Sequence, residues 1–216
     1  MSIISPRINI PDLPDLDEGN LDFHSIGGFE ELTLFSDESL DRVNLTGSTF
    51  SECALNNLSG TDLAWADVRI SESSISRLGA SVIEAPGLVM RQTRISSSRI
   101  GVLHAPESTI SETEIEHSKL DLLALRRAKI TDLRLSNCTI GELDLSGATV
   151  NRVALVDCRI DSLRLSQSTL KHLDLRGAHL GDLDEVSALR GSLLSYEQLL
   201  QFLYPIAAHL GIAVED

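Results

Sequence analysis

Cysteine and histidine are the residue types of this chain that could bind a metal or react as nucleophiles. Cys138 and Cys158 lie twenty residues apart, and Cys53 is the third cysteine. The six histidines show no pair at a spacing typical of metal ligands. The sequence also has no glycine-rich phosphate loop and no nucleophile elbow. We therefore expect a protein that is not an enzyme and that holds no metal and no cofactor.

The composition sets limits on the class of protein. The chain has 216 residues, of which 42% are hydrophobic and 4% aromatic, so a sizeable core would be aliphatic. The N-terminus has no basic start followed by an apolar run, and no stretch approaches the ~20 apolar residues of a membrane span. Three cysteines, an odd number, suit a reducing compartment. We expect a cytoplasmic protein with no membrane contact.

The acidic residues are concentrated at the two ends of the chain, and the formal net charge is −14. Residues 1–39 have nine acidic and one basic side chain, and residues 181–216 have six and one. Residues 40–180 have seventeen acidic and sixteen basic side chains and are nearly neutral. An acidic chain disfavours direct binding of nucleic acid.

Every fifth residue from Leu40 to Leu180 is apolar or glycine, as in Ile140, Leu145 and Val150. Neither an α-helix nor a β-strand has this period. A second series, two residues earlier, alternates between large and small side chains and includes all three cysteines. The remaining positions are mostly polar. Two inward and three outward residues in every five predict a solenoid with one short side per repeat.

The period of the solenoid follows from two similar stretches, "VIEAPG" at 82–87 and "VLHAPE" at 102–107. Their separation of twenty residues predicts four sides per coil, with successive coils about 4.8 Å apart. The repeat then spans about seven coils, which must stack to bury their inner faces. Cys138 and Cys158 would stack in adjacent coils. They could form a metal or redox pair, but we favour a role as small apolar fillers, since neighbouring coils use alanine or serine there.

Short motifs that recur in the five-residue register resemble those of a known family. The best matches are "VNL" at 43–45 and "LDL" at 143–145 and 173–175, and the register extends over about 35–180. The chain resembles the pentapeptide-repeat proteins, whose motif is Ala, Asp or Asn, Leu and two variable residues. The resemblance implies an all-β solenoid, namely a right-handed quadrilateral parallel β-helix. The family includes a quinolone-resistance branch whose members bind DNA gyrase by mimicking DNA.

The ends of the chain predict two flanking segments. We expect an acidic N-terminal leader over 1–20, either ordered or flexible, and a β-helix over 21–183. Residues 184–216 are expected to form an α-helical cap on the last coil. In this segment Ser195 and Gln198 have the spacing of a capping box.

The cap could also join two copies of the chain. Pro205 should kink or divide its helix, and Gly211 should end it. Apolar residues cover more than one face, which favours a homodimer, and quinolone-resistance members of the family look similar here. The candidate dimerisation residues are Tyr196, Leu199, Leu200, Phe202 and Leu203.

Two outer columns are candidates for partner binding. Residues twenty apart stack, so Glu52, Glu72, Glu112 and Asp132 would form an acidic stripe, or simply a solvated face. Val82, Val102 and Leu122 would form an apolar strip, which a loop or the leader could alternatively cover.

The sequence therefore predicts a non-catalytic scaffold that binds an unidentified protein. The alternative is a DNA-mimicking protein that binds gyrase or another topoisomerase. The near-neutral coils speak against that alternative, because a duplex mimic should carry acidic groups along its length.

Overall fold

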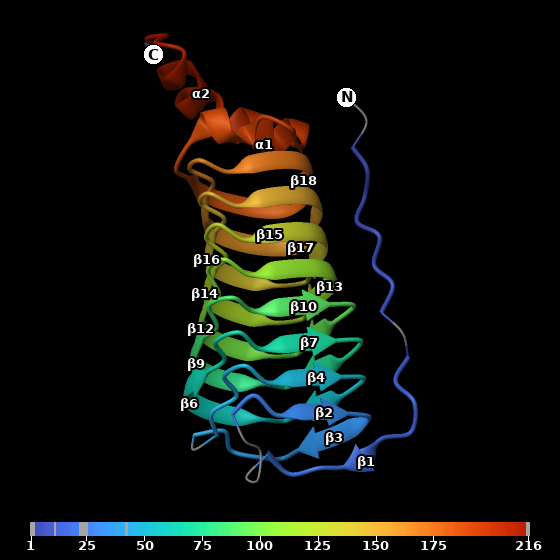
Figure 1. Cartoon of the computed structure of the whole chain (residues 1–216). Coiled ribbons are helices and arrows are strands. Elements are labelled where there is room, and N and C mark those ends of the chain that lie inside the picture. The colour runs from blue at the N-terminus through green and yellow to red at the C-terminus, as the bar shows by residue number, and fades with distance from the viewer. Residues whose placement is uncertain (1–2, 11, 22–25, 42, 215–216) are drawn as a thin grey trace.

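The chain winds into a parallel β-solenoid of about nine turns with a short helical region at its C-terminal end (Figure 1). The computed structural model describes residues 3–10, 12–21, 26–41 and 43–214. Within these residues no helix has the length and apolar character needed to cross a lipid bilayer.

The strands form the walls of the solenoid and the helices lie at its C-terminal end. The strands are β1 (Asp17–Glu18), β2 (Phe29–Glu31), β3 (Thr33–Ser36), β4 (Thr49–Ser51), β5 (Ala54–Asn56), β6 (Ser59–Ala64), β7 (Arg69–Ser71), β8 (Ser74–Ser76), β9 (Gly79–Glu84), β10 (Val89–Arg91), β11 (Arg94–Ser96), β12 (Arg99–His104), β13 (Thr109–Glu116), β14 (Lys119–Ala124), β15 (Lys129–Ser136), β16 (Thr139–Asp144), β17 (Thr149–Arg164), β18 (Thr169–Leu183) and β19 (Ser192–Leu193). The helices are a 3-10 helix η2 (Val186–Leu189), α1 (Tyr196–Gln201) and α2 (Leu203–His209).

The strands pair in parallel with a register of twenty residues through the body of the solenoid. Ile100 lies beside Leu120, and Leu120 lies beside Ile140 in the next coil. The predicted period of twenty residues is therefore confirmed.

The aliphatic residues of the five-residue repeat fill the interior. Leu125, Ile130, Ile140 and Leu145 are all buried, as the repeat predicts. The small series between them is buried too, including Cys53, Cys138 and Cys158. Each buried leucine or isoleucine contributes about 1.5–3 kcal/mol before the entropy of ordering the chain is subtracted. Because one coil cannot cover its own inner face, this stabilisation depends on stacking.

The corners of the coils differ in backbone conformation. At three corners of a coil, one residue adopts a left-handed conformation, as at Asp67 (φ 56°), Glu72 (φ 51°) and Arg77 (φ 53°). The fourth corner stays extended inside the continuous strands β6, β9, β12, β14 and β16. These five strands form the long wall on the left of Figure 1.

The expectation of seven coils was too low, because the winding continues past both ends of the regular repeat. At the N-terminal end β1 pairs with β3, and Asp17 lies beside Thr33, sixteen residues away. At the C-terminal end β18 pairs with β19, and Leu173 lies beside Ser192, nineteen residues away. These end turns break the five-residue spacing, so the sequence pattern did not reveal them.

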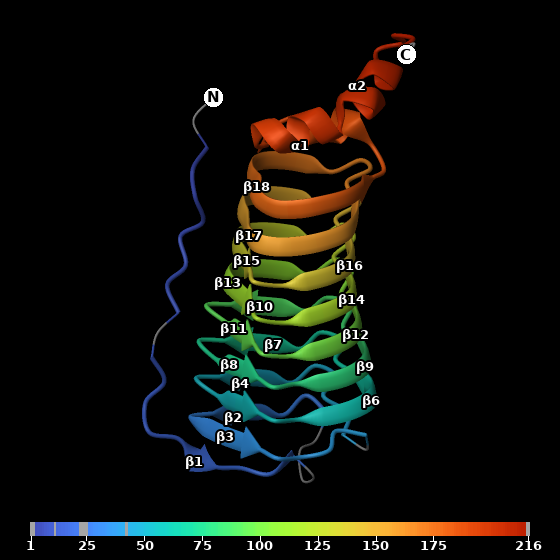
Figure 2. The ribbon, with the colours of Figure 1, turned by 180° about the vertical axis from the view of Figure 1, so that it is seen from behind.

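The C-terminal helices close the last coil. The predicted capping box is present, with reciprocal hydrogen bonds between Ser195 and Gln198. The helical segment divides at Phe202, ahead of Pro205, and ends before Gly211, which has a φ of 72°. Figure 2 shows α1 across the end of the solenoid and α2 directed away from it.

The leader runs along the outside of the solenoid. From β1 it returns toward the C-terminal end, on the side away from the long wall of β6, β9, β12, β14 and β16 (Figures 1 and 2).

Candidate protein-interaction surfaces

The apolar strip lies in the middle of the long wall. Val82, Val102 and Leu122 occupy the same position of β9, β12 and β14 and lie side by side in the sheet. All three side chains are half-buried. The strip therefore exists as predicted, as three aliphatic side chains on the outer face of three successive coils.

Polar groups surround the strip. The next residues of the same ladder are Asp62 on the N-terminal side and Glu142 on the C-terminal side. Beside it, His104 Nδ1 lies 2.7 Å from a carboxylate oxygen of Glu84. A hollow of about 140 Å³ lies at its N-terminal end, lined by Asp62, Leu63, Ala64, Val82 and Glu84. An apolar centre with a polar rim is the usual anatomy of a protein interface.

The side chains of the acidic stripe are less accessible to solvent than their charged character predicts. Glu52, Glu72, Glu112 and Asp132 all sit at a left-handed corner, with φ between 48° and 58°. The first three are half-buried, whereas Asp132 is only 6% exposed. The stripe therefore presents three partly accessible carboxylates and one that is enclosed within the chain.

Asp132 is engaged by groups of its own chain. Arg152 donates two hydrogen bonds to its carboxylate, at 2.7 and 2.6 Å, and the backbone N–H of Arg7 donates a third at 2.8 Å. Burial by itself would raise the pKa of Asp132, but the hydrogen bonds and charges of Arg152 and Arg7 hold that pKa below its ordinary value. Arg152 lies twenty residues after Asp132, so the twenty-residue period places the two in one column, but it did not indicate the ion pair.

Another outer column forms ion pairs between successive coils. Glu114 lies between Arg94 and Arg134, with N–O distances of 3.6 and 3.7 Å, because residues twenty apart stack. Exposed pairs of this kind contribute little to stability.

The C-terminal surface is rich in exposed apolar side chains. Tyr196, Leu199, Leu200 and Leu203 are between 42% and 74% exposed. Phe202 is only 3% exposed and belongs to the core, so it acts in closing the last coil rather than on the surface. The structure adds residues that the sequence analysis omitted from this surface, namely Tyr204, Leu210, Ile212 and Val214.

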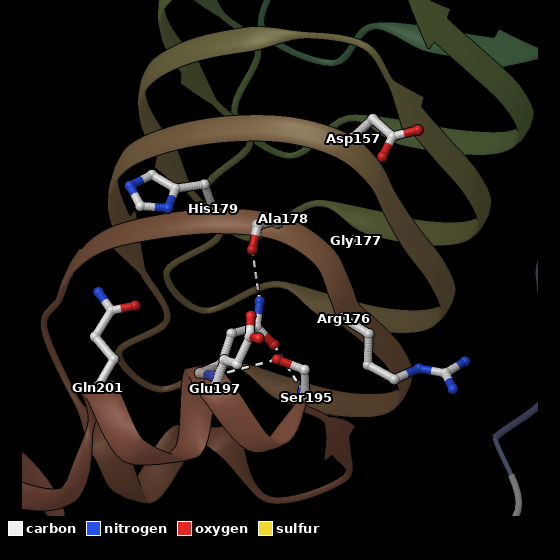
Figure 3. A pocket seen from close by; sticks show the side chains of 9 residues that line it. Asp157, Arg176, Gly177, Ala178, His179, Ser195, Glu197 and Gln201 are labelled. Carbon is white, nitrogen blue, oxygen red and sulfur yellow. Dashed lines mark hydrogen bonds between the residues drawn. The ribbon is translucent and has the colours of Figure 1, made fainter.

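A cavity of about 330 Å³ lies between β18 and α1 (Figure 3). It brings Asp157, His179 and Ser195 to one place, which are the residue types of a catalytic triad. No hydrogen bond joins any two of these three described residues, and Figure 3 shows their side chains pointing in different directions. Ser195 Oγ accepts a hydrogen bond from the backbone N–H of Gln198, so it serves the helix cap.

Two of the three cysteines have the environment of structural thiols. Burial raises the pKa of Cys53, and the neighbouring Cys158 thiol together with burial raises the pKa of Cys138. Thiols with a raised pKa are poor nucleophiles at neutral pH. The hydrogen bond with Cys138 lowers the pKa of Cys158 to about 7, but this thiol is only 3% exposed. Among the described residues no group of three or more His, Cys, Asp or Glu side chains is placed to hold a metal ion.

Comparison with solved structures identifies the same architecture in a known protein. Two trypsin-treated forms of QnrB1, a plasmid-mediated fluoroquinolone resistance protein, superpose with TM-scores of 0.54 and 0.51 at 16% sequence identity. Each match covers 92% of this chain, and 95% and 96% of the respective QnrB1 chain. The chain shares the β-solenoid fold of QnrB1. At this identity the likeness establishes the fold alone.

A comparison of the sequence with protein-family models and with curated proteins finds no match to either. HetL, a pentapeptide repeat protein involved in heterocyst differentiation regulation from the cyanobacterium Nostoc, aligns at 13% identity over 75% of this chain and 92% of its own. Its TM-score of 0.21 is too low to carry an argument.

Proposed function

We propose that the chain is a non-catalytic scaffold of the pentapeptide-repeat type that binds a partner protein through the long wall of its solenoid. The observation that carries the proposal is the stack of Val82, Val102 and Leu122 on the outer face of three successive coils. A cytoplasmic location agrees with the free cysteines.

The test replaces one residue at the centre of the strip. Val102→Glu introduces a charge that a partner would have to desolvate, so captured partners should be lost while the melting temperature stays near that of wild type. Thr149→Glu makes the same change at an exposed position outside the long wall and serves as the control. If wild type, Val102→Glu and Thr149→Glu capture the same proteins in quantitative pull-downs, the strip is not the binding surface.

Glu52, Glu72 and Glu112 are a second candidate surface for a basic partner. Asp132 belongs to the same column, but its carboxylate is already paired with Arg152. Replacing the three half-buried glutamates by glutamine should weaken such a partner and reduce the salt dependence of binding.

Binding to DNA gyrase or another topoisomerase is the alternative function. The solenoid matches QnrB1 over 95% of that chain, so the two rods are similar in extent. The basic residues of the coils speak against this alternative, because they would face the same cationic groove of the topoisomerase as the acidic residues. Titration into gyrase supercoiling and quinolone-poisoning assays tests the alternative. The absence of any effect at a molar excess of about tenfold or more would remove it.

We also propose that the exposed apolar surface of α1 and α2 joins two copies of the chain. Leu203, Tyr204, Ala207 and Val214 line a hollow of about 310 Å³ on this surface. A homodimer predicts twice the monomer mass in light scattering, and the variant Leu199→Glu/Leu203→Glu should restore the monomer mass. A monomeric wild type at all accessible concentrations would contradict the dimer.

A further inference from the structure

The leader is held against one column of the solenoid by three hydrogen bonds. Ile4 N–H donates to His172 Nδ1 at 3.3 Å, and Arg7 N–H donates to Asp132 Oδ1 at 2.8 Å. Gln92 Nε2 donates to the carbonyl oxygen of Asn9 at 2.9 Å. In each case the solenoid supplies a side chain and the leader supplies a main-chain group. Such contacts recognise an extended backbone more than a particular set of side chains.

Apolar side chains of the leader add to these contacts. Pro6 is buried and lies between two of the hydrogen-bonded residues, and Ile3, Ile8 and Ile10 are half-buried. The side chain of Ile4, by contrast, is 46% exposed. The leader therefore buries part of its surface, with proline at the most enclosed position.

The receiving column is built by the solenoid without help from the leader. Asp132 and Arg152 lie in adjacent coils and hold each other through two hydrogen bonds, so the acceptor for Arg7 N–H is already oriented. With the leader in place, both Asp132 and His172 are buried. A site that is organised in advance binds with a smaller loss of conformational entropy.

We propose that the column of Gln92, Asp132, Arg152 and His172 is a recognition surface for an extended peptide, which the leader occupies in the free protein. The partner segment that fits has the leader's own chemistry, namely aliphatic residues around a proline followed by a basic residue, as in "IISPRINI" at 3–10. The leader competes with that segment and masks the surface until it is displaced. The surface lies on the side away from Val82, Val102 and Leu122, so this proposal fails separately from the proposal that the apolar strip binds a partner. It continues the column of Glu52, Glu72 and Glu112, and the docked leader therefore also masks part of that second candidate surface.

The covalent link between the leader and the solenoid sets an upper limit on the Kd that a separate leader peptide must show. A short linker gives the leader an effective concentration on the order of 1 mM at its own site. If the leader is docked about nine-tenths of the time, the same peptide added as a separate molecule must bind an empty site with a Kd of about 0.1 mM or lower.

The experiment empties the site in the full chain and refills it from solution. Ile4→Pro/Arg7→Pro removes two donors from the leader and leaves the solenoid unchanged. A fluorescent peptide with the sequence of residues 3–16 should bind this variant with a Kd of about 0.1 mM or lower, by fluorescence anisotropy. Wild type should bind it at least about tenfold more weakly, because its site is occupied. Ser5→Ala, a leader change at an exposed residue, should behave like wild type.

Variants of the column locate the binding. Adding Asp132→Ala to the double variant should weaken the peptide at least about fivefold, and Gln92→Ala provides a milder change if the first variant does not fold. In wild type, hydrogen exchange should show protected amides at Ile4 and Arg7. The proposal is overturned if the double variant fails to bind the peptide or binds no better than wild type. It is equally overturned if these amides exchange at the random-coil rate, or if wild type forms a dimer that the double variant loses, which would mean that leaders exchange between copies.

Discussion

At the scale of single residues, the interior of the solenoid tolerates no charge. Leu145 is 2% exposed and Ile140 is fully buried, with aliphatic neighbours from the coils on either side. A carboxylate at either position would lose its hydration and find no partner, which costs several kcal/mol.

We predict that Leu145→Asp or Ile140→Asp prevents folding, as measured by solubility and by the thermal transition in circular dichroism. Thr149→Asp introduces the same charge at an exposed position four residues after Leu145, and this variant should melt like wild type. A soluble Leu145→Asp protein with a cooperative transition would contradict the inward position of this residue.

Arg152 illustrates a surface residue whose energetic role the column pattern did not reveal. An outward arginine on a solvated column would change stability by less than about 0.5 kcal/mol when replaced by alanine. In the structure Arg152 instead holds the enclosed Asp132 carboxylate through two hydrogen bonds.

We predict that Arg152→Ala lowers the free energy of unfolding by about 1–3 kcal/mol, because it leaves a buried carboxylate without its main partner. Chemical denaturation measures the change. Arg159→Ala is the matched control, since Arg159 pairs with Asp161 at an exposed site and should change stability by less than about 0.5 kcal/mol. Equal effects of the two substitutions would refute the distinction.

At the scale of elements, the last coil depends on α1 to satisfy its backbone. Gln198 is buried, and its side-chain amide donates hydrogen bonds of 2.6 Å to the carbonyl oxygens of Leu175 and Ala178. Without this cover, the final turn would leave carbonyl groups unpaired in an apolar environment. The short helix therefore acts as an end cap for the strands as well as for itself.

We predict that Gln198→Ala destabilises the protein by about 1–3 kcal/mol, with the loss concentrated in the last turn. Relative to wild type, hydrogen exchange should become faster in β18 and β19 more than in β12, because each coil of a solenoid is stabilised mainly by its neighbours. Gln201→Ala, which removes a similar contact at an exposed residue, should have a smaller effect. Uniform changes in exchange along the whole rod would argue against a local cap.

At the scale of the whole molecule, we expect that carboxylates held by hydrogen bonds in the folded state govern the response to acid. Arg176 lowers the pKa of Asp174 by hydrogen bonding to it. For Asp144, burial would raise the pKa, but Ser146 and Arg126 together hold it below its ordinary value. A carboxylate with a lowered pKa contributes stability above its unfolded pKa of about 3.9, and that contribution is lost as the pH falls through its folded pKa.

We predict that the difference in unfolding free energy between wild type and Asp144→Asn is largest near pH 7 and shrinks as the pH falls below about 4. Comparing the two proteins cancels most of the general effect of net charge. Denaturation curves at several pH values provide the measurement. A difference that stays constant or grows in acid would show that the ionised form of Asp144 is not the one that stabilises the fold.

The sequence by itself determined the parts of this protein that repeat. The five-residue spacing from Leu40 to Leu180 was enough to predict the solenoid and its inward residues, and the similar stretches at 82–87 and 102–107 gave its twenty-residue register. A periodic apolar pattern has this power because each coil must bury its own inner face on the next one. The capping box of Ser195 and Gln198 was predictable for a similar reason, since both partners lie within one turn of helix.

Only the tertiary structure decided the features that do not repeat. The end turns beyond the regular repeat, the enclosure of Phe202 and the path of the leader leave no periodic trace. The leader contact joins Arg7 to Asp132, 125 residues apart, through a main-chain N–H that every residue except proline possesses. Because no residue type is required there, no spacing in the sequence could announce that contact. It exists only once the coils have stacked and brought Asp132, Arg152 and His172 into one column.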